Sequence, residues 1–366
     1  MKFYMPTKLY LEKDCVYQHR KELAALGSRA LLVTGRHSAR INGAYDDVVK
    51  SLEDQGVSYS LFDEIEENPS VETVARAASF GREQKADFVI GIGGGSPMDA
   101  AKAIALLMNH PEEEPSVLYE KKELEALPVA AVPTTAGTGS EVTPYAILTL
   151  HELQTKKSMS HHVFPALSLA DAKYLTFAGR ELLIHTAVDT LAHLIESHLN
   201  KNTTEYSRLF SARGLKLWGE IKEALSTGEL SGGQYEKLMR TSTLGGMSIS
   251  HTGTSFPHGM SYYLTYHMGV PHGKAVGIFL PAFLELYGTK EPAEVRQVLE
   301  YLNFDGADPF REYMQQILGI IKVTGDQITS YANGMMANTA KLANFPYPVT
   351  LEQMRELFEK SLAVQS

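Results

Sequence analysis

The sequence contains almost no cysteine, since Cys15 is the only one among 366 residues. An intramolecular disulfide and a metal site built from several thiolates are therefore excluded. Any metal ion must be bound by histidine and carboxylate side chains. A chain without disulfides is typical of the reducing cytosol, so we expect a cytoplasmic protein.

Long apolar runs and blocks of basic residues are also missing. No run approaches the roughly 20 apolar residues that span a bilayer. The opening segment MKFYMPTKLYLEK lacks the apolar core of a signal peptide. The net charge is −9, whereas a nucleic-acid or anionic-membrane partner favours a concentrated positive patch. We expect neither partner, and the sequence leaves a homo-oligomer open.

The two halves of the chain have different periodicities. In the first half, short apolar runs alternate with amphipathic stretches, which predicts a parallel sheet with helices on both faces. In the second half the pattern is mostly helical. Because a chain of this length exceeds a single core, we predict an α/β domain over 1–176 and an all-α domain over 177–366. The expected strands are 30–34, 57–62, 88–90 and 128–132, and the expected helices are 44–55, 71–84, 181–199, 207–225, 234–244, 309–323, 326–342 and 351–362.

A buried strand that runs into glycines forms a candidate phosphate site. The run Gly93-Gly94-Gly95 is followed by Ser96, which can cap a helix with Pro97 at its first position. Glycines let backbone N–H groups approach a phosphate, and a helix N-terminus adds partial positive charge. The alternative is a tight turn without a ligand. Three consecutive glycines favour phosphate binding, although Ser96 replaces the last glycine of the usual dinucleotide fingerprint.

A second loop of small residues, Pro133–Thr143, follows the next expected strand. Its hydroxyls and glycines suit a ribose, a diphosphate or an amide, and a solvated loop is the alternative. Ligands of parallel sheets bind at the carboxyl ends of the strands. Two such loops at successive strand ends therefore support each other as parts of one nucleotide site.

Asp189 and His193 are four residues apart in an otherwise apolar helical stretch. They project from one helix face, so both can reach one cation, although a hydrogen-bonded Asp–His pair without a metal is the alternative. His258 and His272, each followed by glycine, can complete the site. One carboxylate and three imidazoles suit Fe(II), Zn(II), Co(II) or Ni(II) better than Mg(II) or Ca(II). Glu196 is expected to orient His193.

These separated motifs resemble the iron-containing (group III) alcohol dehydrogenases. The similarity covers nearly the whole chain, including the closing region Lys341–Pro346. It implies an N-terminal dinucleotide-binding α/β domain and a helical C-terminal metal-binding domain. It also implies one divalent ion, with Asp189, His193, His258 and His272 as its ligands. The residues implied to line the cofactor site are Asn68, Gly94, Gly95, Ser96, Asp99, Thr134, Thr135, Thr138, Thr143 and Lys156.

Two positions depart from the usual pattern of this family. The segment before Pro165 is one residue shorter, so Lys157 can take the place of Lys156. Tyr262 stands where many members carry another histidine, four residues after the first metal histidine of this segment. The acid–base group is therefore left open, with Tyr262 and His267 as candidates.

The end of the first expected strand bears on which nicotinamide cofactor is used. Members of this family that prefer NAD often carry Asp there, and its charge repels a 2′-phosphate. Here Gly35 occupies that position and leaves room. Ser38 can donate a hydrogen bond, and Arg36 or Arg40 can add a charge-assisted one. We therefore predict a preference for NADP over NAD, with a plain solvated turn as the alternative.

The resemblance implies a metal-dependent NAD(P)-linked alcohol dehydrogenase that acts on short primary alcohols or diols and reduces the matching aldehydes. The rivals are a dehydroquinate-synthase-like lyase and a glycerol-dehydrogenase-like polyol oxidoreductase. A polyanionic lyase substrate needs several Lys or Arg residues, and the segment from His251 to Gly273 has none. A nucleotide-binding protein without enzymatic activity is disfavoured, because both loops and all four expected metal ligands are present.

Overall fold

A computed structural model describes residues 3–365. The chain forms two compact units. The first unit is Tyr4–Ala178, and the second runs from Gly179 onward and includes Phe3. The predicted domain boundary was placed after residue 176, and folding of the two parts as independent domains stays a prediction. No helix in the described part of the chain is long and apolar enough to cross a membrane.

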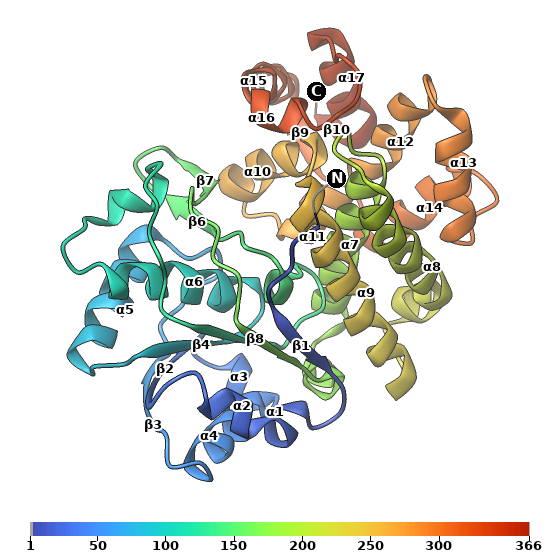
Figure 1. The fold of residues 1–366 in the computed structure, drawn as a ribbon. Coiled ribbons are helices and arrows are strands. Elements are labelled where there is room, and N and C mark those ends of the chain that lie inside the picture. Colours follow the sequence, from blue (N-terminus) through green and yellow to red (C-terminus); the bar gives the residue numbers. More distant parts are fainter. Residues whose placement is uncertain (1–2, 366) are drawn as a thin grey trace. The chain divides into compact units, whose positions relative to one another are not determined.

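The first unit is built on a six-stranded sheet with the order β1-β8-β5-β4-β2-β3 (Figure 1). Every neighbouring pair in this sheet is parallel. The four predicted strands are present, and two short strands, β1 and β8, were not predicted. The strands are β1 (Lys8–Leu11), β2 (Arg29–Thr34), β3 (Ser58–Phe62), β4 (Phe88–Gly93), β5 (Val129–Pro133) and β8 (Leu167–Ala170).

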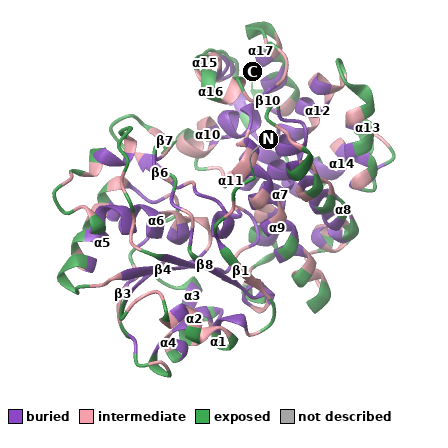
Figure 2. Cartoon of the chain, viewed as in Figure 1, coloured by how far each residue is buried: buried purple, intermediate pink, exposed green. Residues whose placement is uncertain are grey.

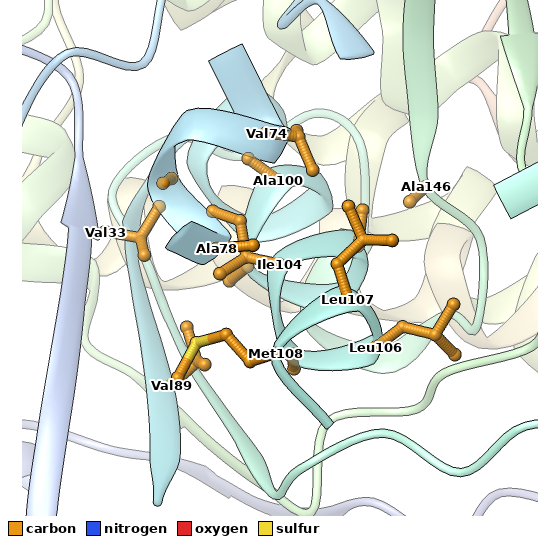
Figure 3. Packing of buried hydrophobic residues seen from close by; sticks show 14 of the residues in the cluster. Val33, Val74, Ala78, Val89, Ala100, Ile104, Leu106, Leu107, Met108 and Ala146 are labelled. Carbon is orange, nitrogen blue, oxygen red and sulfur yellow. The ribbon is translucent and has the colours of Figure 1, made fainter. Parts of the chain in front are cut away.

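Helices cover both faces of this sheet, as the sequence predicted. Successive side chains of a strand point to opposite faces, so Leu31 and Val33 pack in the core with α5 and α6 (Figure 3). Ala30 and Leu32 pack in the core of the other face. Figure 2 shows the central strands as buried. The helices are α1 (Cys15–Gln18), α2 (Arg20–Ala24), α3 (Ser38–Ile41), α4 (Ala44–Glu53), α5 (Val71–Glu83) and α6 (Gly95–Asn109).

Shorter elements complete the first unit. An antiparallel pair, β6 (Ile147–Leu150) and β7 (Thr155–Ser158), follows the second glycine-containing loop. Three short 3₁₀ helices lie in the connections: η1 (Pro115–Tyr119), η2 (Ser140–Val142) and η3 (Ala172–Phe177).

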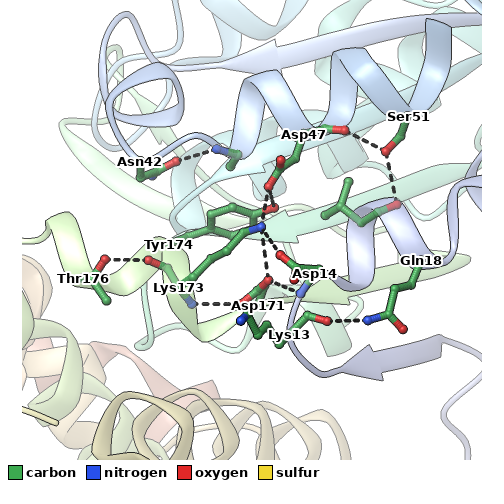
Figure 4. A network of polar contacts seen from close by, with 12 residues as sticks. Lys13, Asp14, Gln18, Asn42, Asp47, Ser51, Asp171, Lys173, Tyr174 and Thr176 are labelled. Carbon is green, nitrogen blue, oxygen red and sulfur yellow. Dashed lines mark hydrogen bonds and ion pairs between the residues drawn. The ribbon is translucent and has the colours of Figure 1, made fainter. Parts of the chain in front are cut away.

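A polar network fastens α1 and α4 to the segment after β8 (Figure 4). Lys173 Nζ lies 2.6 Å from Asp14 Oδ1 and 2.8 Å from Asp47 Oδ2. The Tyr174 hydroxyl donates to Asp47 at 2.7 Å, and the Asp14 amide donates to Asp171 at 2.5 Å. Burial lowers the pKa of Lys173, but the carboxylates of Asp14 and Asp47 outweigh it and raise that pKa overall. The network therefore keeps a charged lysine among three carboxylates and ties three distant segments together.

The second unit is mostly helical, which confirms the predicted fold class. Its first three helices pack against one another, and the buried Trp218 of α8 donates to the Ala187 carbonyl of α7 at 2.8 Å. The described residues add one parallel strand pair, β9 (Lys322–Thr324) with β10 (Ala363–Gln365). The helices are α7 (Arg180–His198), α8 (Glu205–Thr227), α9 (Gly232–Thr252), α10 (Phe256–Met268), α11 (His272–Gly277), α12 (Leu280–Gly288), α13 (Pro292–Tyr301), α14 (Ala307–Leu318), α15 (Gly325–Ala337), α16 (Thr339–Leu342) and α17 (Leu351–Ser361).

Some predicted helix boundaries in this unit are wrong. The helix expected over 309–323 ends at Leu318, and the residues that follow enter β9. The helix expected over 326–342 is interrupted at Asn338, which ends α15 and caps α16 by accepting a hydrogen bond from the Lys341 amide at 3.3 Å. The helices α10 to α13 were not predicted.

Candidate metal centre and cofactor loops

Asp189 and His193 lie on α7, and both are buried, with 3% and 5% of their surface exposed. The helix is enclosed here because α8, α9 and α11 all contact it. An ionised carboxylate in such a position is unfavourable unless it is paired or coordinates a cation. The groups around Asp189 therefore show whether a cation can compensate its buried charge.

Three imidazole nitrogens surround one oxygen of that carboxylate. Asp189 Oδ1 lies 3.5 Å from Nε2 of His258, 3.6 Å from Nε2 of His272 and 3.7 Å from Nε2 of His193. Across residues 3–365, neither Asp189 Oδ1 nor His258 Nε2 has a hydrogen-bond partner. Ligands arranged tetrahedrally at about 2.1 Å from an ion lie roughly 3.4 Å from one another. The observed spacing and the two orphaned buried atoms therefore fit a bound divalent cation.

The four residues do not contribute equally to this geometry. The ligand atoms of Asp189, His258 and His272 all lie within 4.8 Å of one another, and His193 is not part of that group. The His193 ring instead stacks on the His258 ring, with 4.7 Å between centroids. Burial raises the pKa of Asp189, but the imidazoles of His193 and His272 outweigh it and lower that pKa overall. The carboxylate is thus ionised, the form that binds a metal ion. The assignment of all four ligands stays a prediction.

Glu196 contacts His258, another of the expected ligands. Its Oε1 lies 2.5 Å from Nδ1 of His258, and its Oε2 accepts a hydrogen bond from the Ser255 amide at 2.5 Å. Both carboxylate oxygens of Glu196 thus contact the start of α10, and the expectation that Glu196 orients His193 stays a prediction. A hydrogen bond from Nδ1 to a carboxylate fixes the tautomer and leaves the Nε2 lone pair for a metal ion. His272 has a weaker contact of this kind, with 3.4 Å between its Nδ1 and the Ser261 hydroxyl.

The His-Gly sequence at residue 272 reflects close packing of two helices. A Cβ atom at Gly273 would lie 1.7 Å from the backbone oxygen of His185 on α7. Only glycine therefore allows α11 to approach α7 this closely. His272 is the first residue of α11, so this approach is what brings its ring to Asp189.

The two candidate acid–base residues lie in different surroundings. The Tyr262 ring lies 6.2 Å from the His272 ring, centroid to centroid. His267 is exposed near the end of α10, where it stacks on Tyr331 at 5.9 Å. Of the two, only Tyr262 is placed beside a proposed metal ligand in the described structure, and the acid–base group stays open.

In the first unit, the two small-residue loops meet. The register of β4 and β5 pairs Gly93 with Pro133, so the loops leave the sheet side by side. A Cβ atom at Gly94 would lie 3.0 Å from Thr135 Oγ1, and one at Gly95 would lie 2.6 Å from Thr138 Cγ2. The glycines are thus required for the contact between the loops as well as for any approach of a phosphate.

Ser96 does not cap the following helix. Helix α6 begins at Gly95 with Gly94 as its N-cap and no side-chain cap bond, so Ser96 and Pro97 lie inside the first turn. The Ser96 hydroxyl instead accepts a hydrogen bond from the Asn68 amide at 3.1 Å. The predicted cap is therefore wrong, because a neighbouring loop provides a donor that the local sequence does not reveal.

Asn68 also links the glycine turn to a lysine. Its Oδ1 accepts a hydrogen bond from Lys156 Nζ at 2.9 Å. The structure therefore brings Asn68, Ser96 and Lys156 together, all three of them expected cofactor residues. Lys157 points elsewhere, with its Nζ 5.0 Å from the centroid of the Tyr119 ring. The two lysines lie next to each other on β7, where successive side chains alternate between faces.

A buried polar cluster holds the second loop against α6. Asp99 accepts hydrogen bonds from the Ser140 hydroxyl at 2.5 Å and from the Ile147 amide at 2.8 Å. Lys102 is fully buried and donates to Ser140 Oγ and to the Tyr145 carbonyl, both at 2.7 Å. Burial lowers the pKa of Lys102 to about 8, against the opposing effect of Asp99. Sequence analysis did not identify Lys102, and a direct contact of Asp99 with the cofactor stays a prediction.

The remaining expected cofactor residues lie on these loops or after β2. Thr134 donates its amide to the Gly93 carbonyl at 2.8 Å, and Thr143 is buried. After β2, Gly35 is half-buried, while Arg36 and Ser38 are exposed. The Arg40 guanidinium stacks on the Tyr45 ring at 4.2 Å. Arg36 and Ser38 therefore have side chains at the surface beside Gly35.

Two family models match consecutive parts of the chain. Residues 6–172 match iron-containing alcohol dehydrogenase, and residues 183–362 match the C-terminal part of the Fe-containing alcohol dehydrogenase family. The long-chain primary alcohol dehydrogenase AdhA of Thermoanaerobacter ethanolicus is 32% identical over 70% of this chain and 66% of its own length. The NADPH-dependent butanol dehydrogenase of Clostridium saccharobutylicum is 25% identical over 88% of this chain and 83% of its own length.

The fold agrees with these sequence similarities. An iron-containing alcohol dehydrogenase from Thermotoga maritima superposes with a TM-score of 0.91 and 34% identity, over 99% of both chains. The predicted family and enzyme class are thereby confirmed, and this chain belongs to the iron-containing alcohol dehydrogenases.

Proposed function

We propose that this chain interconverts short primary alcohols or diols and the matching aldehydes, with NADP(H) preferred over NAD(H). We further propose Fe(II) as the metal, with Zn(II), Ni(II) or Co(II) as replacements. Membership of the family implies a metal ion and a nicotinamide cofactor. The observation that supports the metal site most is the buried Asp189 Oδ1, which faces three imidazole nitrogens and has no hydrogen-bond partner among residues 3–365.

In this proposal the chain supplies binding and orientation. Asp189, His193, His258 and His272 would hold the ion, and the Glu196 hydrogen bond to His258 Nδ1 keeps Nε2 turned toward it. When bound, a divalent ion supplies Lewis acidity, which lowers the pKa of an alcohol and polarises an aldehyde carbonyl. The overall reaction converts an alcohol and NADP⁺ into an aldehyde, NADPH and a proton.

The cofactor would be bound by the two loops of the first unit. Backbone N–H groups at the start of α6 suit the diphosphate, because a helix N-terminus carries partial positive charge. Asn68 and Lys156 add polar side chains beside that turn. The name of the Clostridium relative specifies NADPH and butanol, which supports the same choice of cofactor and substrate here. The cytoplasmic location stays a prediction.

A lyase of the dehydroquinate synthase type is not favoured by the comparisons, which match alcohol dehydrogenases. The segment from His251 to Gly273 contains no Lys or Arg for a polyanion. A polyol oxidoreductase differs from the proposed enzyme in its substrate, and a substrate panel separates the two.

We expect one divalent ion per chain and turnover of C3–C4 primary alcohols and aldehydes. The experiment is metal analysis of the purified protein together with steady-state kinetics on 1-propanol, 1-butanol, 1,3-propanediol, glycerol and hydroxy acids, each with NADP⁺ and NAD⁺. The segment from His251 to Gly273, which carries two of the expected metal ligands, also carries Phe256, Met260, Tyr262, Tyr263 and Leu264. Because these side chains suit short apolar substrates, kcat/KM should be higher for C3–C4 alcohols than for charged hydroxy acids. A clear preference for a dicarboxylate or a sugar acid would contradict the proposal.

The two adjacent lysines of β7 provide a matched test of the cofactor site. Lys156→Met should raise the Kd for NADPH by about 10-fold, since hydrogen bonds from charged groups are the stronger ones. Lys157→Met, which removes the same charge from the next residue, should leave that Kd within about 2-fold because Lys157 lies over Tyr119. The measurement is titration of NADPH fluorescence in the protein without substrate. Equal effects of both variants would show that Lys156 acts only through net charge.

A further inference from the structure

A lysine of α16 contacts the first half of α10, the helix that carries His258. The Lys341 Nζ donates a hydrogen bond to Thr254 Oγ1. The same ammonium lies 6.0 Å from the centroid of the Tyr262 ring. Its aliphatic stem runs along α10, since a Cβ atom at Gly259 would lie 3.4 Å from Lys341 Cγ. The side chain therefore contacts α10 near its start.

These contacts are on the part of α10 that carries a proposed metal ligand. His258 and Tyr262 are four residues apart, so they project from one face of the helix. The Tyr262 ring in turn lies 6.2 Å from the ring of His272. Thr254 immediately precedes Ser255, whose amide binds the carboxylate that orients His258. Lys341 thus contacts two residues, Thr254 and Tyr262, that each adjoin a group holding or contacting a proposed metal ligand.

The ammonium of Lys341 is poorly compensated. Within residues 3–365 it forms no ion pair at 4.0 Å or less, and its acceptor is a neutral hydroxyl. Burial lowers the pKa of Lys341, with Glu196 acting in the opposite direction. An ammonium has three N–H donors, so a partly buried lysine with a single acceptor can donate to a further oxygen. A second oxygen atom of the substrate would be such an acceptor.

We propose that Lys341 is a specificity-determining residue that donates a hydrogen bond to a second hydroxyl of the substrate, so that short diols are better substrates than the matching monoalcohols. The inference rests on the proposed function. A hydroxyl is the expected acceptor, because the ammonium already donates to a hydroxyl, that of Thr254. Lys341 lies outside the segment from His251 to Gly273, whose lack of Lys and Arg disfavours a polyanionic substrate.

The test compares 1,3-propanediol with 1-propanol as substrates of the metal-loaded protein. In the unmodified protein, kcat/KM should be higher for the diol. Lys341→Met should lower the diol-to-propanol ratio of kcat/KM by about 10-fold, the effect typical of a lost hydrogen bond to a charged donor. Lys341→Arg should retain part of the ratio, because the guanidinium also donates. Lys322→Met, which removes an exposed lysine of β9, serves as the matched control and should leave the ratio unchanged.

The ratio separates recognition from a structural role. A loss of packing at α16 would lower kcat/KM for both substrates alike, and an equal loss would overturn the inference while leaving the proposed function intact. A ratio that favours 3-hydroxypropanoate over the diol would also overturn it, since the acceptor would then be an anion. If the unmodified protein oxidises neither alcohol, the proposed function fails and the inference fails with it. Thermal unfolding of each variant shows whether it is folded. If Lys341→Met does not fold, Lys341→Gln is measured in its place.

Discussion

His272→Ala should reduce the bound metal to well below one ion per chain and lower kcat/KM by at least about 10- to 100-fold. Even changes in groups that only orient a ligand produce losses of that order, and this variant removes a ligand itself. The His272 side chain is 26% exposed, so its removal leaves the buried hydrogen bonds of Glu196 intact. We therefore expect the fold to survive. His258→Ala should lose metal as well, but it also deprives the buried Glu196 Oε1 of its partner, which destabilises the fold.

Metal content, kinetics and thermal unfolding of the same preparations check this prediction. His110→Ala is a suitable control, because His110 lies at the C-terminal end of α6 in the first unit and its ring contacts the Glu125 carbonyl. Adding a chelator should lower the unfolding midpoint of the unmodified protein, because a ligand that binds only the folded state stabilises it. The same chelator should have little effect on His272→Ala. Full activity of a metal-free His272→Ala protein would refute the metal site.

One part of the candidate metal site, the pairing of Asp189 with His193, could be predicted because it depends on local periodicity. Asp189 and His193 are one helical turn apart, so the sequence alone places them on one face of α7. The partner of Glu196 could not be predicted, since it depends on where α10 begins relative to α7 in space. The same is true of Gly273, whose contact is with the backbone of His185. Residues paired across elements leave no periodic pattern in the sequence.

The local sequence explains why β1 and α10 were missed. The strand β1 has four residues, none of them fully buried, so no alternation of apolar and polar residues marks it. Helix α10 begins with Phe256-Pro257-His258-Gly259, which reads locally as a turn because Pro and Gly usually interrupt helices. Pro is nevertheless acceptable in a first turn, where its missing N–H needs no partner.

The two loops were predicted from their glycines, but the hydrogen bonds that hold them in place were not. Lys102 lies in an apolar helix and bonds to Ser140 and to the Tyr145 carbonyl, both about 40 residues later in the chain. The choice between Lys156 and Lys157 was open from the sequence, because it depends on the pairing of β6 with β7. In that pairing Lys156 lies opposite Thr149, and the Thr149 hydroxyl bonds to the carbonyl of Asn68 at 2.7 Å. An antiparallel pair therefore selects the lysine that faces Asn68.

Gly35→Asp should erase or reverse the preference for NADP(H), chiefly by weakening NADP(H). In the unmodified protein we expect kcat/KM with NADP(H) to exceed that with NAD(H) on the order of 10- to 100-fold, since hydrogen bonds to charged groups contribute about 1.5–3 kcal/mol. The exposed Arg36 and Ser38 would supply these bonds to a 2′-phosphate. Arg40 is less suited, because its guanidinium already stacks on Tyr45. A carboxylate at position 35 would repel the phosphate and offer an acceptor to the ribose hydroxyls of NAD.

The substitution also adds a side chain in limited space, and Gly35→Ala separates that effect from the charge. A Cβ atom at this position would lie 3.3 Å from the Ile65 carbonyl oxygen, so both variants require the same small shift of the backbone. Gly35→Ala should therefore lower kcat/KM for the two cofactors by similar factors and keep their ratio, whereas Gly35→Asp should change the ratio. Arg36→Ala should lower kcat/KM with NADP(H) and leave that with NAD(H) nearly unchanged, because only the phosphate needs the guanidinium. If the unmodified protein uses NADH as efficiently as NADPH, or more efficiently, then the turn after β2 does not bind the 2′-phosphate. The proposed preference for NADP(H) would then be wrong, while the assignment to the family would be unaffected.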